Sequence, residues 1–255
     1  MYIHNLDPVM FHIGPFEARY YGLVYVLTAI LCYYFLRKNK DKLKLTNDNV
    51  DSFLMQIILG VVIGARLFQV LVWEPAYYLA NPFKIIALWE GGMSLHGGIL
   101  GIALVGYLFC RKHKISIAKL ADILIIPLMI GLAFGRIANF INGEIIGTIT
   151  SLPWCVQFPS YNDCMHPVQL YASAGRFILV GFLIYLIKAR KNLKQGCLTW
   201  TALCLMSLGR FFLDFIREDP RFLGLSLGQY LSLLLFIISA VILYKYYYKK
   251  SFKYA

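Results

Sequence analysis

The hydrophobic positions of this chain fall into long runs that are separated by short polar connections. Seven runs are each about as long as the roughly 20 residues that an α-helix needs to cross a hydrocarbon core. They cover residues 17–36, 50–73, 94–110, 119–140, 168–187, 197–216 and 226–244. The pattern predicts an all-α, polytopic integral membrane protein with about seven transmembrane helices, in a single transmembrane domain over residues 1–255.

Basic residues distinguish the connections from one another. Clusters of lysine and arginine follow the first, third, fifth and seventh runs, and the other connections hold few basic residues. The clusters lie at residues 37–44, 111–119, 188–194 and 245–253. Because short basic loops stay in the cytoplasm, this asymmetry predicts an outer N-terminus and a cytoplasmic C-terminus.

Composition narrows the class of protein. Of the 255 residues, 59% are hydrophobic and 15% are charged, against about 25% charged in an ordinary soluble domain. A net charge of +12 would point to nucleic acid in a soluble protein. Here the basic clusters account for the charge as topology signals, so we expect no nucleic acid among the partners.

Motifs for several other kinds of chemistry are absent from the sequence, which has no G-x-x-x-x-G-K-[ST], H-E-x-x-H or G-x-G-x-x-G. We therefore expect no cofactor, and no metal site because the histidines lack ligand spacing. Cys155 and Cys164 share a connection that is predicted to lie outside, where a disulfide is permitted. Two free thiols are the alternative.

Charged residues inside the predicted spans indicate a site, because a charge at mid-membrane costs about 2.5–3.5 kcal/mol on insertion scales and so usually faces a cavity. One cluster contains Arg136, Asn139, Asn142, Glu144 and Gly147. In a helix Asn142 would point away from the others, so we expect the segment to unwind near its outer end. The cluster predicts a pocket for a polar head group; a helix-packing seam joined by amides is the alternative.

A second cluster lies at the outer end of the sixth predicted span. Arg210 and Asp214 are i,i+4 partners there, and Asp214 and Arg217 are i,i+3 partners. The planar fork of arginine donates two hydrogen bonds at once and therefore suits phosphate. An ion-pair ladder at the helix end is the alternative interpretation.

Further polar residues lie at the ends of spans. His96 stands among glycines at the start of the third span, and imidazole titrates in the range of a general base; a hydrogen-bonded structural histidine is the alternative. His166 and Pro167 favour a helix start, with proline at its first position. Tyr21 and Arg66 complete the set, and Tyr21 is also typical of an interfacial aromatic residue.

Together, and in chain order, these clusters resemble the bacterial prolipoprotein diacylglyceryl transferase family. The strongest match is Gly-Arg-x-x-Asn-Phe-Ile-Asn-x-Glu-x-x-Gly at residues 135–147. The supporting matches are Arg-x-Tyr-Gly at 19–22, Gly-x-Arg at 64–66, Ser-x-His-Gly-Gly at 94–98, His-Pro-x-Gln-Leu-Tyr at 166–171 and Arg-Phe-x-x-acid-Phe-x-Arg at 210–217. The resemblance covers nearly the whole chain and implies the same seven spans and orientation.

The resemblance implies a specific reaction. A diacylglyceryl group leaves phosphatidylglycerol for the lipobox cysteine thiol in the signal peptide of a prolipoprotein, a thioether forms, and glycerol phosphate is released. The expected setting is the lipid of the bacterial cytoplasmic membrane, with the active site toward the outer side. We expect catalytic roles for His96, which would activate the thiol, and for Arg136 and Arg210, which would stabilise the departing phosphate. Substrate binding is expected of Tyr21, Asn139, Asn142, Glu144, Gly147, Asp214 and Arg217.

Three residues depart from the pattern that the resemblance implies. Met206 stands where the family usually has tyrosine, Asp214 where glutamate is common, and Ala172 where glutamate usually follows the Leu-Tyr pair. These changes leave two alternatives open. One is a divergent member that transfers a phospholipid-derived group to another acceptor, and the other is a non-catalytic lipid or anion transporter or receptor.

Overall fold

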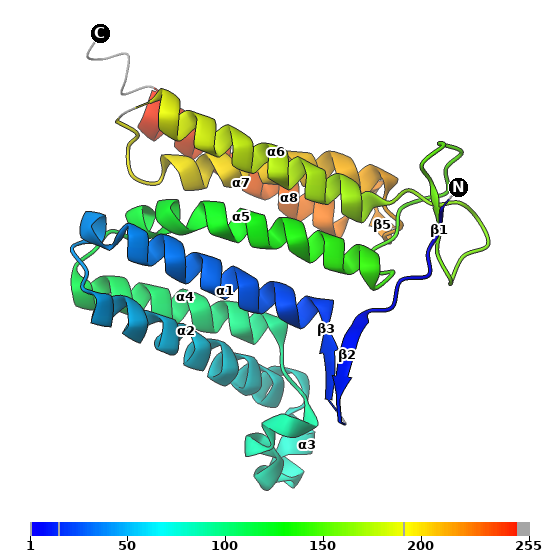
Figure 1. Ribbon diagram of the computed structural model, residues 1–255, viewed down its shortest axis with the longest axis horizontal. Helices are drawn as coiled ribbons and strands as arrows, with labels where there is room; N and C mark the ends of the chain where they lie inside the picture. The colour runs from blue at the N-terminus through cyan, green and yellow to red at the C-terminus, as the bar shows by residue number, and fades with distance from the viewer. Residues whose placement is uncertain (1, 15, 191, 249–255) are drawn as a thin grey trace. The chain divides into compact units, whose positions relative to one another are not determined.

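The computed structural model of the chain describes residues 2–14, 16–190 and 192–248 (Figure 1). It divides into two compact units, each of which is described by itself. Unit 1 comprises the described residues of Met1–Cys32 and Ala121–Ala255, and unit 2 comprises Tyr33–Leu120. The boundary between the units falls inside two helices. The expectation of a single transmembrane domain stays a prediction.

Six helices in the described part of the chain are long and apolar enough to cross a membrane: Tyr20–Lys38, Asn47–Trp73, Ile117–Ile141, Val168–Ala189, Cys197–Ile216 and Leu227–Tyr247. The remaining predicted span forms α4 (Leu95–His113), which also has 19 residues. It is less apolar because glycines and His96 occupy its first turn, and Arg111 and Lys112 its last. The all-α, polytopic architecture is confirmed, and the orientation stays a prediction.

Unit 1 is built mainly from helices. They are α1 (Tyr20–Lys38) up to its boundary at Cys32, α5 (Ile117–Ile141) from Ala121 onward, α6 (Val168–Ala189), α7 (Cys197–Leu213) and α8 (Leu227–Ile242). The last turn of α7 continues as the 3₁₀ helix η5 (Asp214–Ile216), and α8 continues as the π-helix η6 (Leu243–Tyr248). In Figure 1, α6, α7 and α8 form one layer beside α5.

Short strands connect the helices of unit 1 at one end of the bundle. β1 (Tyr2–Ile3) pairs in parallel with β4 (Val156–Gln157). β2 (Val9–Ile13) pairs antiparallel with β3 (Phe16–Arg19), and β5 (Arg221–Phe222) pairs antiparallel with β6 (Leu225–Ser226). Each sheet has two strands, so the strands shape the connections and form no layer of their own.

Close contacts hold the unit 1 helices together. A Cβ on Gly131 of α5 would lie 2.3 Å from Thr28 Oγ1 of α1, so this position requires glycine. On α6, Ser173 donates to the backbone oxygen of Ala133 at 3.0 Å. At the start of α8, Ser226 and Gln229 form a reciprocal capping box, which satisfies two backbone donors that would otherwise lack partners.

The N-terminus of α7 is completed by a residue of another helix. The carboxylate of Asp122, on α5, accepts hydrogen bonds from Gly196 N at 2.6 Å and from Thr199 N at 2.8 Å. The Thr199 hydroxyl donates to the same carboxylate at 2.7 Å. The first turn of a helix has four backbone N–H groups without intrahelical partners, and Asp122 satisfies part of that set from outside α7.

Unit 2 is organised around the pair α2 (Asn47–Phe68) and α4. Glycines form the contact: a Cβ on Gly97 would lie 2.2 Å from the backbone oxygen of Gly64, and one on Gly101 would lie 2.0 Å from that of Gly60. The two backbones therefore approach as closely as glycine alone permits. The glycines around His96 thus have a packing role.

Short helical turns connect α2 to α4. α2 continues as the π-helix η2 (Gln69–Trp73), followed by α3 (Pro75–Ala80) and the 3₁₀ turns η3 (Pro82–Ile86) and η4 (Leu88–Glu90). At its other end, α2 follows the 3₁₀ turn η1 (Lys40–Leu43), and Thr46 and Asn49 cap its first turn.

Candidate active site

The end of α5 carries an arginine and an amide that are joined to two other predicted site residues. Arg136 Nη1 donates to Asn139 Oδ1 at 3.3 Å. Asn139 Nδ2 donates in turn to the Tyr21 hydroxyl and, at 3.2 Å, to Glu144 Oε2. Asn139 is buried, so its amide connects an arginine, a phenol and a carboxylate away from solvent.

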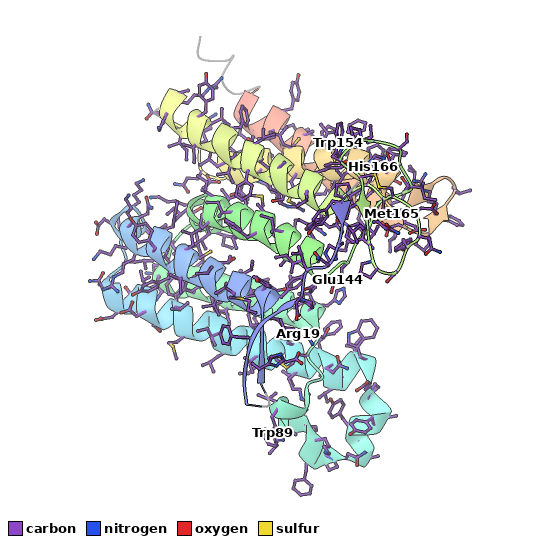
Figure 2. The ribbon with its side chains drawn as sticks, turned by 45° about the vertical axis from the view of Figure 1, so that its right-hand side comes forward. Arg19, Trp89, Glu144, Trp154, Met165 and His166 are labelled. Atoms are coloured by element: carbon purple, nitrogen blue, oxygen red, sulfur yellow. A yellow bond between two sulfur atoms is a disulfide. The ribbon has the colours of Figure 1, made fainter. Side chains whose placement is uncertain are left out.

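The chain reverses directly after α5. Gly143 has φ +65°, a conformation that favours glycine, and the turn brings Glu144 N to the backbone oxygen of Asn139 at 3.0 Å. Figure 2 shows Glu144 just past the end of this helix. The predicted unwinding is confirmed. Asn142 lies past the last helical residue, so it is not held to the helical register, and its amide donates to Glu144 Oε1 at 3.2 Å.

A cavity of about 590 Å³ lies in unit 1 among residues of α5, α6, α7 and the turns that follow α5 and α7. Much of its wall is apolar, with contributions from Ile178, Leu179, Phe182, Leu205 and Leu213. The charged side chains that line it are Arg136, Arg176, Arg210, Arg217 and Asp214. An apolar chamber with arginines in its wall suits an amphipathic anion.

The carboxylate of Asp214 is shared between two of these arginines. Asp214 Oδ2 lies 3.5 Å from Arg210 Nε, and Oδ1 lies 3.8 Å from Arg217 Nη1. The predicted i,i+4 and i,i+3 pairs are therefore both formed. Arg217 Nε also lies 3.1 Å from Asp219 Oδ2. Asp214 is 2% exposed, and a buried carboxylate is stable only when it is paired in this way.

The other two arginines have no carboxylate partner within the described residues. Arg136 donates to the amide oxygen of Asn139, and Arg176 Nη1 donates to the backbone oxygen of Ala172 at 2.9 Å. The four positive charges act on one another: Arg210 and Arg217 repel Arg136, and Arg136 and Arg210 repel Arg176. The cavity wall thus carries an excess of positive charge.

Gly147 holds two parts of unit 1 close together. Its N–H donates to the backbone oxygen of His166 at 3.1 Å, and it bridges to Arg217 as an isolated antiparallel pair. A Cβ here would lie 2.6 Å from His166 Cβ and 2.7 Å from a methyl group of Val168. The structure therefore gives this predicted binding residue a positioning role.

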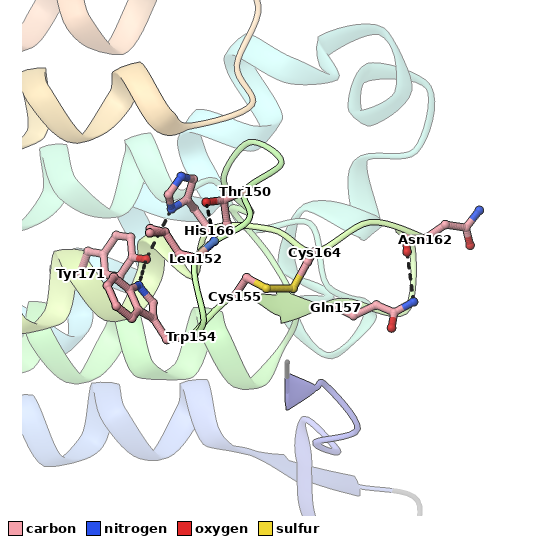
Figure 3. The surroundings of a disulfide bond; sticks show 9 residues. All are labelled: Thr150, Leu152, Trp154, Cys155, Gln157, Asn162, Cys164, His166 and Tyr171. Atoms are coloured by element: carbon pink, nitrogen blue, oxygen red, sulfur yellow. Dashed lines mark hydrogen bonds between the residues drawn. A yellow bond between two sulfur atoms is a disulfide. The ribbon is translucent and has the colours of Figure 1, made fainter.

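The start of α6 also differs by one residue from the prediction. The helix begins at Val168, and Pro167 occupies the cap position before it, so proline is not at the first helical position as expected. His166 lies in the preceding loop (Figure 2). Its Nδ1 lies 3.4 Å from the Tyr171 hydroxyl, to which Trp154 Nε1 donates at 2.7 Å (Figure 3).

The loop that precedes α6 contains a disulfide between Cys155 and Cys164, whose Cα atoms are 5.5 Å apart (Figure 3). The alternative of two free thiols is therefore wrong. In the same loop the Tyr161 hydroxyl bonds to Glu218, and this carboxylate raises the pKa of Tyr161 above its usual value. The disulfide closes the loop on itself, and the bond to Glu218 connects it to the segment that follows Arg217.

His96 belongs to unit 2 and is described apart from the cavity. It lies in the first turn of α4, with its ring 6.1 Å from that of Phe68 and 6.2 Å from that of Trp73. It is exposed and forms no hydrogen bond within the described part of the chain. The alternative of a hydrogen-bonded structural histidine is therefore wrong in this structure.

Arg66, another charge in a predicted span, has a structural role within unit 2. It is 5% exposed, and its guanidinium stacks on the Tyr78 ring at 5.1 Å. It donates to backbone oxygens of the turns before α4, which include Ile85 at 2.8 Å and Gly92 at 2.8 Å. Arg66 thus satisfies backbone oxygens of this connection that would otherwise need hydrogen bonds from water.

Sequence reasoning assigned no function to Arg176 and Gln169, although both line the cavity. Gln169 is 1% exposed, and its Nε2 donates to the backbone oxygen of Glu144 at 2.6 Å. That bond fixes the orientation of the amide, because a carbonyl only accepts, and the Gln169 oxygen is left without a partner in the described residues. The available signals were a charge in a span and an amide in the His-Pro-x-Gln-Leu-Tyr segment.

Comparison with known proteins gives the same family as the sequence motifs. The sequence model of the family described as prolipoprotein diacylglyceryl transferase matches residues 8–245. Several relatives carry the name phosphatidylglycerol–prolipoprotein diacylglyceryl transferase. Those of Wolbachia pipientis subsp. Culex pipiens (strain wPip) and Geobacter sulfurreducens are each 39% identical over 249 residues, which cover 93% of this chain and 94% of the relative. That of Cupriavidus metallidurans is 38% identical over 254 residues, 94% of each chain.

Proposed function

The chain belongs to the prolipoprotein diacylglyceryl transferase family, and we propose that the cavity of unit 1 is where its phospholipid substrate reacts. The protein is a transferase that moves a diacylglyceryl group to prolipoproteins. One observation carries the proposal about the site: the cavity combines an apolar wall with four arginines and a single carboxylate. The phosphate of phosphatidylglycerol fits the arginines, and its acyl chains fit the wall.

The reaction replaces one carbon–oxygen bond of the lipid with a carbon–sulfur bond. The thiolate sulfur of the lipobox cysteine attacks the diacylglyceryl carbon that is bonded to the phosphate oxygen. A carbon–sulfur bond forms, the carbon–oxygen bond breaks, and the oxygen leaves with the electron pair as glycerol phosphate. The phosphate gains negative charge in this step, so preorganised arginines in the cavity wall bind the transition state more strongly than the ground state.

The roles of the individual residues follow from their contacts. Arg136 has no carboxylate partner in the described residues, so its guanidinium is available to the phosphate. Arg210 is held by Asp214 and assists Arg136. The amide oxygen of Asn139 accepts a hydrogen bond from Arg136, and its amide nitrogen donates to Tyr21 and Glu144. Asn139, held in this way, fixes the position of the Arg136 guanidinium.

Three further residues support the proposed binding site of unit 1. Asn142 supports Glu144, and Gly147 and Arg217 keep the turn after α5 next to the end of α7. His96 belongs to unit 2, and its role is proposed separately from the cavity. It is exposed and forms no hydrogen bond in the described structure, so its nitrogen atoms are available to accept a thiol proton.

The setting of the reaction is also part of the proposal. The protein is a multi-pass membrane protein, and its basic clusters favour a cytoplasmic C-terminus. The cavity-lining ends of α5 and α7 then face the outer side of the bacterial cytoplasmic membrane. Prolipoproteins that carry a lipobox cysteine in a signal peptide expose their thiol on that side.

Mass spectrometry of a lipobox peptide tests the function and the site together. Purified protein is incubated with phosphatidylglycerol vesicles and the peptide, and the thioether product is measured. The wild type is expected to form it, and Arg136→Ala to lose at least about a hundredfold in rate, as for removal of one oxyanion donor. Arg190→Ala, at the exposed end of α6, is the matched control. Full activity of Arg136→Ala would refute the role of this residue.

The same experiment separates the alternatives. Met206 and Ala172 both line the cavity, so the departures from the family pattern occur where the substrate is proposed to bind. A product on another acceptor, with none on the peptide, would indicate a divergent transferase. Lipid or anion movement without a covalent product would indicate a transporter or receptor.

A further inference from the structure

We propose that Arg176 forms a second phosphate subsite in the cavity, in addition to the arginines that bind the reacting phosphate. The proposal rests on the proposed function, because it concerns the lipid that enters the same cavity. It adds a ligand class: a phospholipid whose head group carries two phosphates, or free glycerol phosphate as the second anion.

The first support is the position of Arg176. It is the ninth residue of α6, so it lies about 12 Å along the helix axis from the first residue. It lines the cavity with Ala172, Gly175 and Leu179 of the same helix. A charge at this depth in a membrane span is costly unless an anion or a polar group compensates it.

The second support is the lack of an internal anion. The only hydrogen bond of Arg176 within the described residues is the one from Nη1 to the backbone oxygen of Ala172 at 2.9 Å. Its Nε is buried and has no partner in the part of the chain that the structure describes. A guanidinium has five N–H donors, so most of its binding capacity is unused.

The third support is the charge of the cavity wall as a whole. Asp214 is the only carboxylate among the described lining residues, and it is already shared by Arg210 and Arg217. One phosphodiester carries a single negative charge, and Arg136 and Arg210 are enough to bind it. Arg176 remains, and both of these arginines repel it, so a second anion beside it relieves that repulsion.

The neighbouring residue provides the space. Ala172 stands one turn before Arg176 and also lines the cavity. Its methyl group leaves room beside the guanidinium and supplies no competing charge. The departure from the family pattern at this position therefore has a consequence: the carboxylate that would occupy the same wall is absent, and an anionic ligand takes its place.

The test compares lipids with one and two phosphates in the head group. Full-length protein is reconstituted in phosphatidylcholine vesicles that contain equal amounts of phosphatidylglycerol and cardiolipin, and the lipids retained after purification are measured by mass spectrometry. A lipid-borne second phosphate predicts that the wild type retains cardiolipin at least about tenfold over phosphatidylglycerol, from one charge-assisted interaction. Arg176→Leu is expected to bring that ratio close to one, and Arg176→Lys to retain part of it.

A second arm tests the free anion. Glycerol phosphate is titrated in thermal unfolding of the wild type and of Arg176→Leu. If the subsite takes the free phosphate, the variant requires about tenfold more ligand for the same stabilisation. Arg190→Leu, at an exposed arginine directly after the same helix, is expected to match the wild type in both arms. Its thermal unfolding, with that of Arg176→Lys, separates a binding effect from a folding defect.

The outcomes distinguish the subsite from the catalytic function. Loss of the cardiolipin preference in Arg176→Leu supports the subsite and shows that a lipid head group supplies the second phosphate. Weaker stabilisation of Arg176→Leu by glycerol phosphate supports the subsite and shows that the free anion supplies it. Unchanged lipid ratios and unchanged glycerol phosphate titrations in Arg176→Leu overturn it, even when thioether formation from phosphatidylglycerol is intact. A failure of thioether formation, with the binding differences retained, overturns the proposed function and leaves the subsite.

Discussion

Gly228 offers a test of the cavity that does not alter any residue in its wall. It is the second residue of α8, and a Cβ there would lie 2.6 Å from Asp214 Oδ2 and 3.1 Å from Arg210 Nη2. Gly228→Ala therefore pushes on the carboxylate that holds Arg210. Asp214 is 2% exposed, so it has little room to move toward water.

The expected size of the effect follows from three contributions. Overpacking by one methyl group costs about 1–3 kcal/mol, and disturbance of a buried ion pair adds to that cost. Alanine in place of glycine in a helix returns about 0.5–1 kcal/mol. We expect a net loss of about 2 kcal/mol of stability. Displacement of Arg210 is also expected to weaken its contact with the departing phosphate, and a loss of about 1.4 kcal/mol of transition-state stabilisation there lowers the transfer rate about tenfold.

The assay combines thermal unfolding in detergent with thioether formation on the lipobox peptide. Gly181→Ala, on α6, is the matched control, because a Cβ at Gly181 meets nothing within 4 Å. We expect that control to be as stable as the wild type or slightly more stable. If Gly228→Ala behaves like Gly181→Ala in both measurements, the geometry described around Asp214 is wrong.

A double-mutant cycle tests the route of the effect. In an Asp214→Asn background the ion pair with Arg210 is already weakened, so Gly228→Ala is expected to add little further loss of activity. Additive losses would mean that Gly228 acts through another contact.

Two more predictions concern the loop before α6 and the helix pair of unit 2. Cys155→Ser is expected to lower the free energy of unfolding by about 2–4 kcal/mol and to make the loop more sensitive to limited proteolysis. If a reductant still destabilises this variant, the effect does not come from the disulfide. Gly97→Ala is expected to cost about 1–3 kcal/mol in thermal unfolding, because the new Cβ collides with the backbone of Gly64. Gly106→Ala, on the same helix with open space around it, is expected to change little, and equal losses in the two variants would refute the close contact.

The helices were predictable from the sequence because lipid requires each backbone to satisfy its own hydrogen bonds. Charges in the spans identified Arg136 and Arg210 as cavity residues. Helical spacing predicted the ion pairs of Asp214 with Arg210 and Arg217. The hydrophobic pattern was less informative for α6, which is apolar on most sides. Its rotation about its own axis, and so the direction of Arg176, depends on packing against α5 and α7.

The contacts around Glu144 show a second limit of sequence reasoning. Helical periodicity holds up to Ile141 and then stops, because Gly143 reverses the chain. Beyond such a turn, spacing along the sequence no longer says which side chains meet. The bond from Asn142 to Glu144 and the bond from Gln169 to the Glu144 backbone both depend on that turn.

The carboxylate of Asp122 has a consequence for how the protein is made. Its partner Thr199 follows 77 residues later in the chain, so α5 is synthesised well before the helix that it caps. The exposed N–H groups at the start of α7 find their acceptor only when α5 is already in place. The order of synthesis and the order of assembly therefore agree. The first turn of α7 obtains its full set of hydrogen bonds when α7 docks against α5, and not through membrane insertion alone.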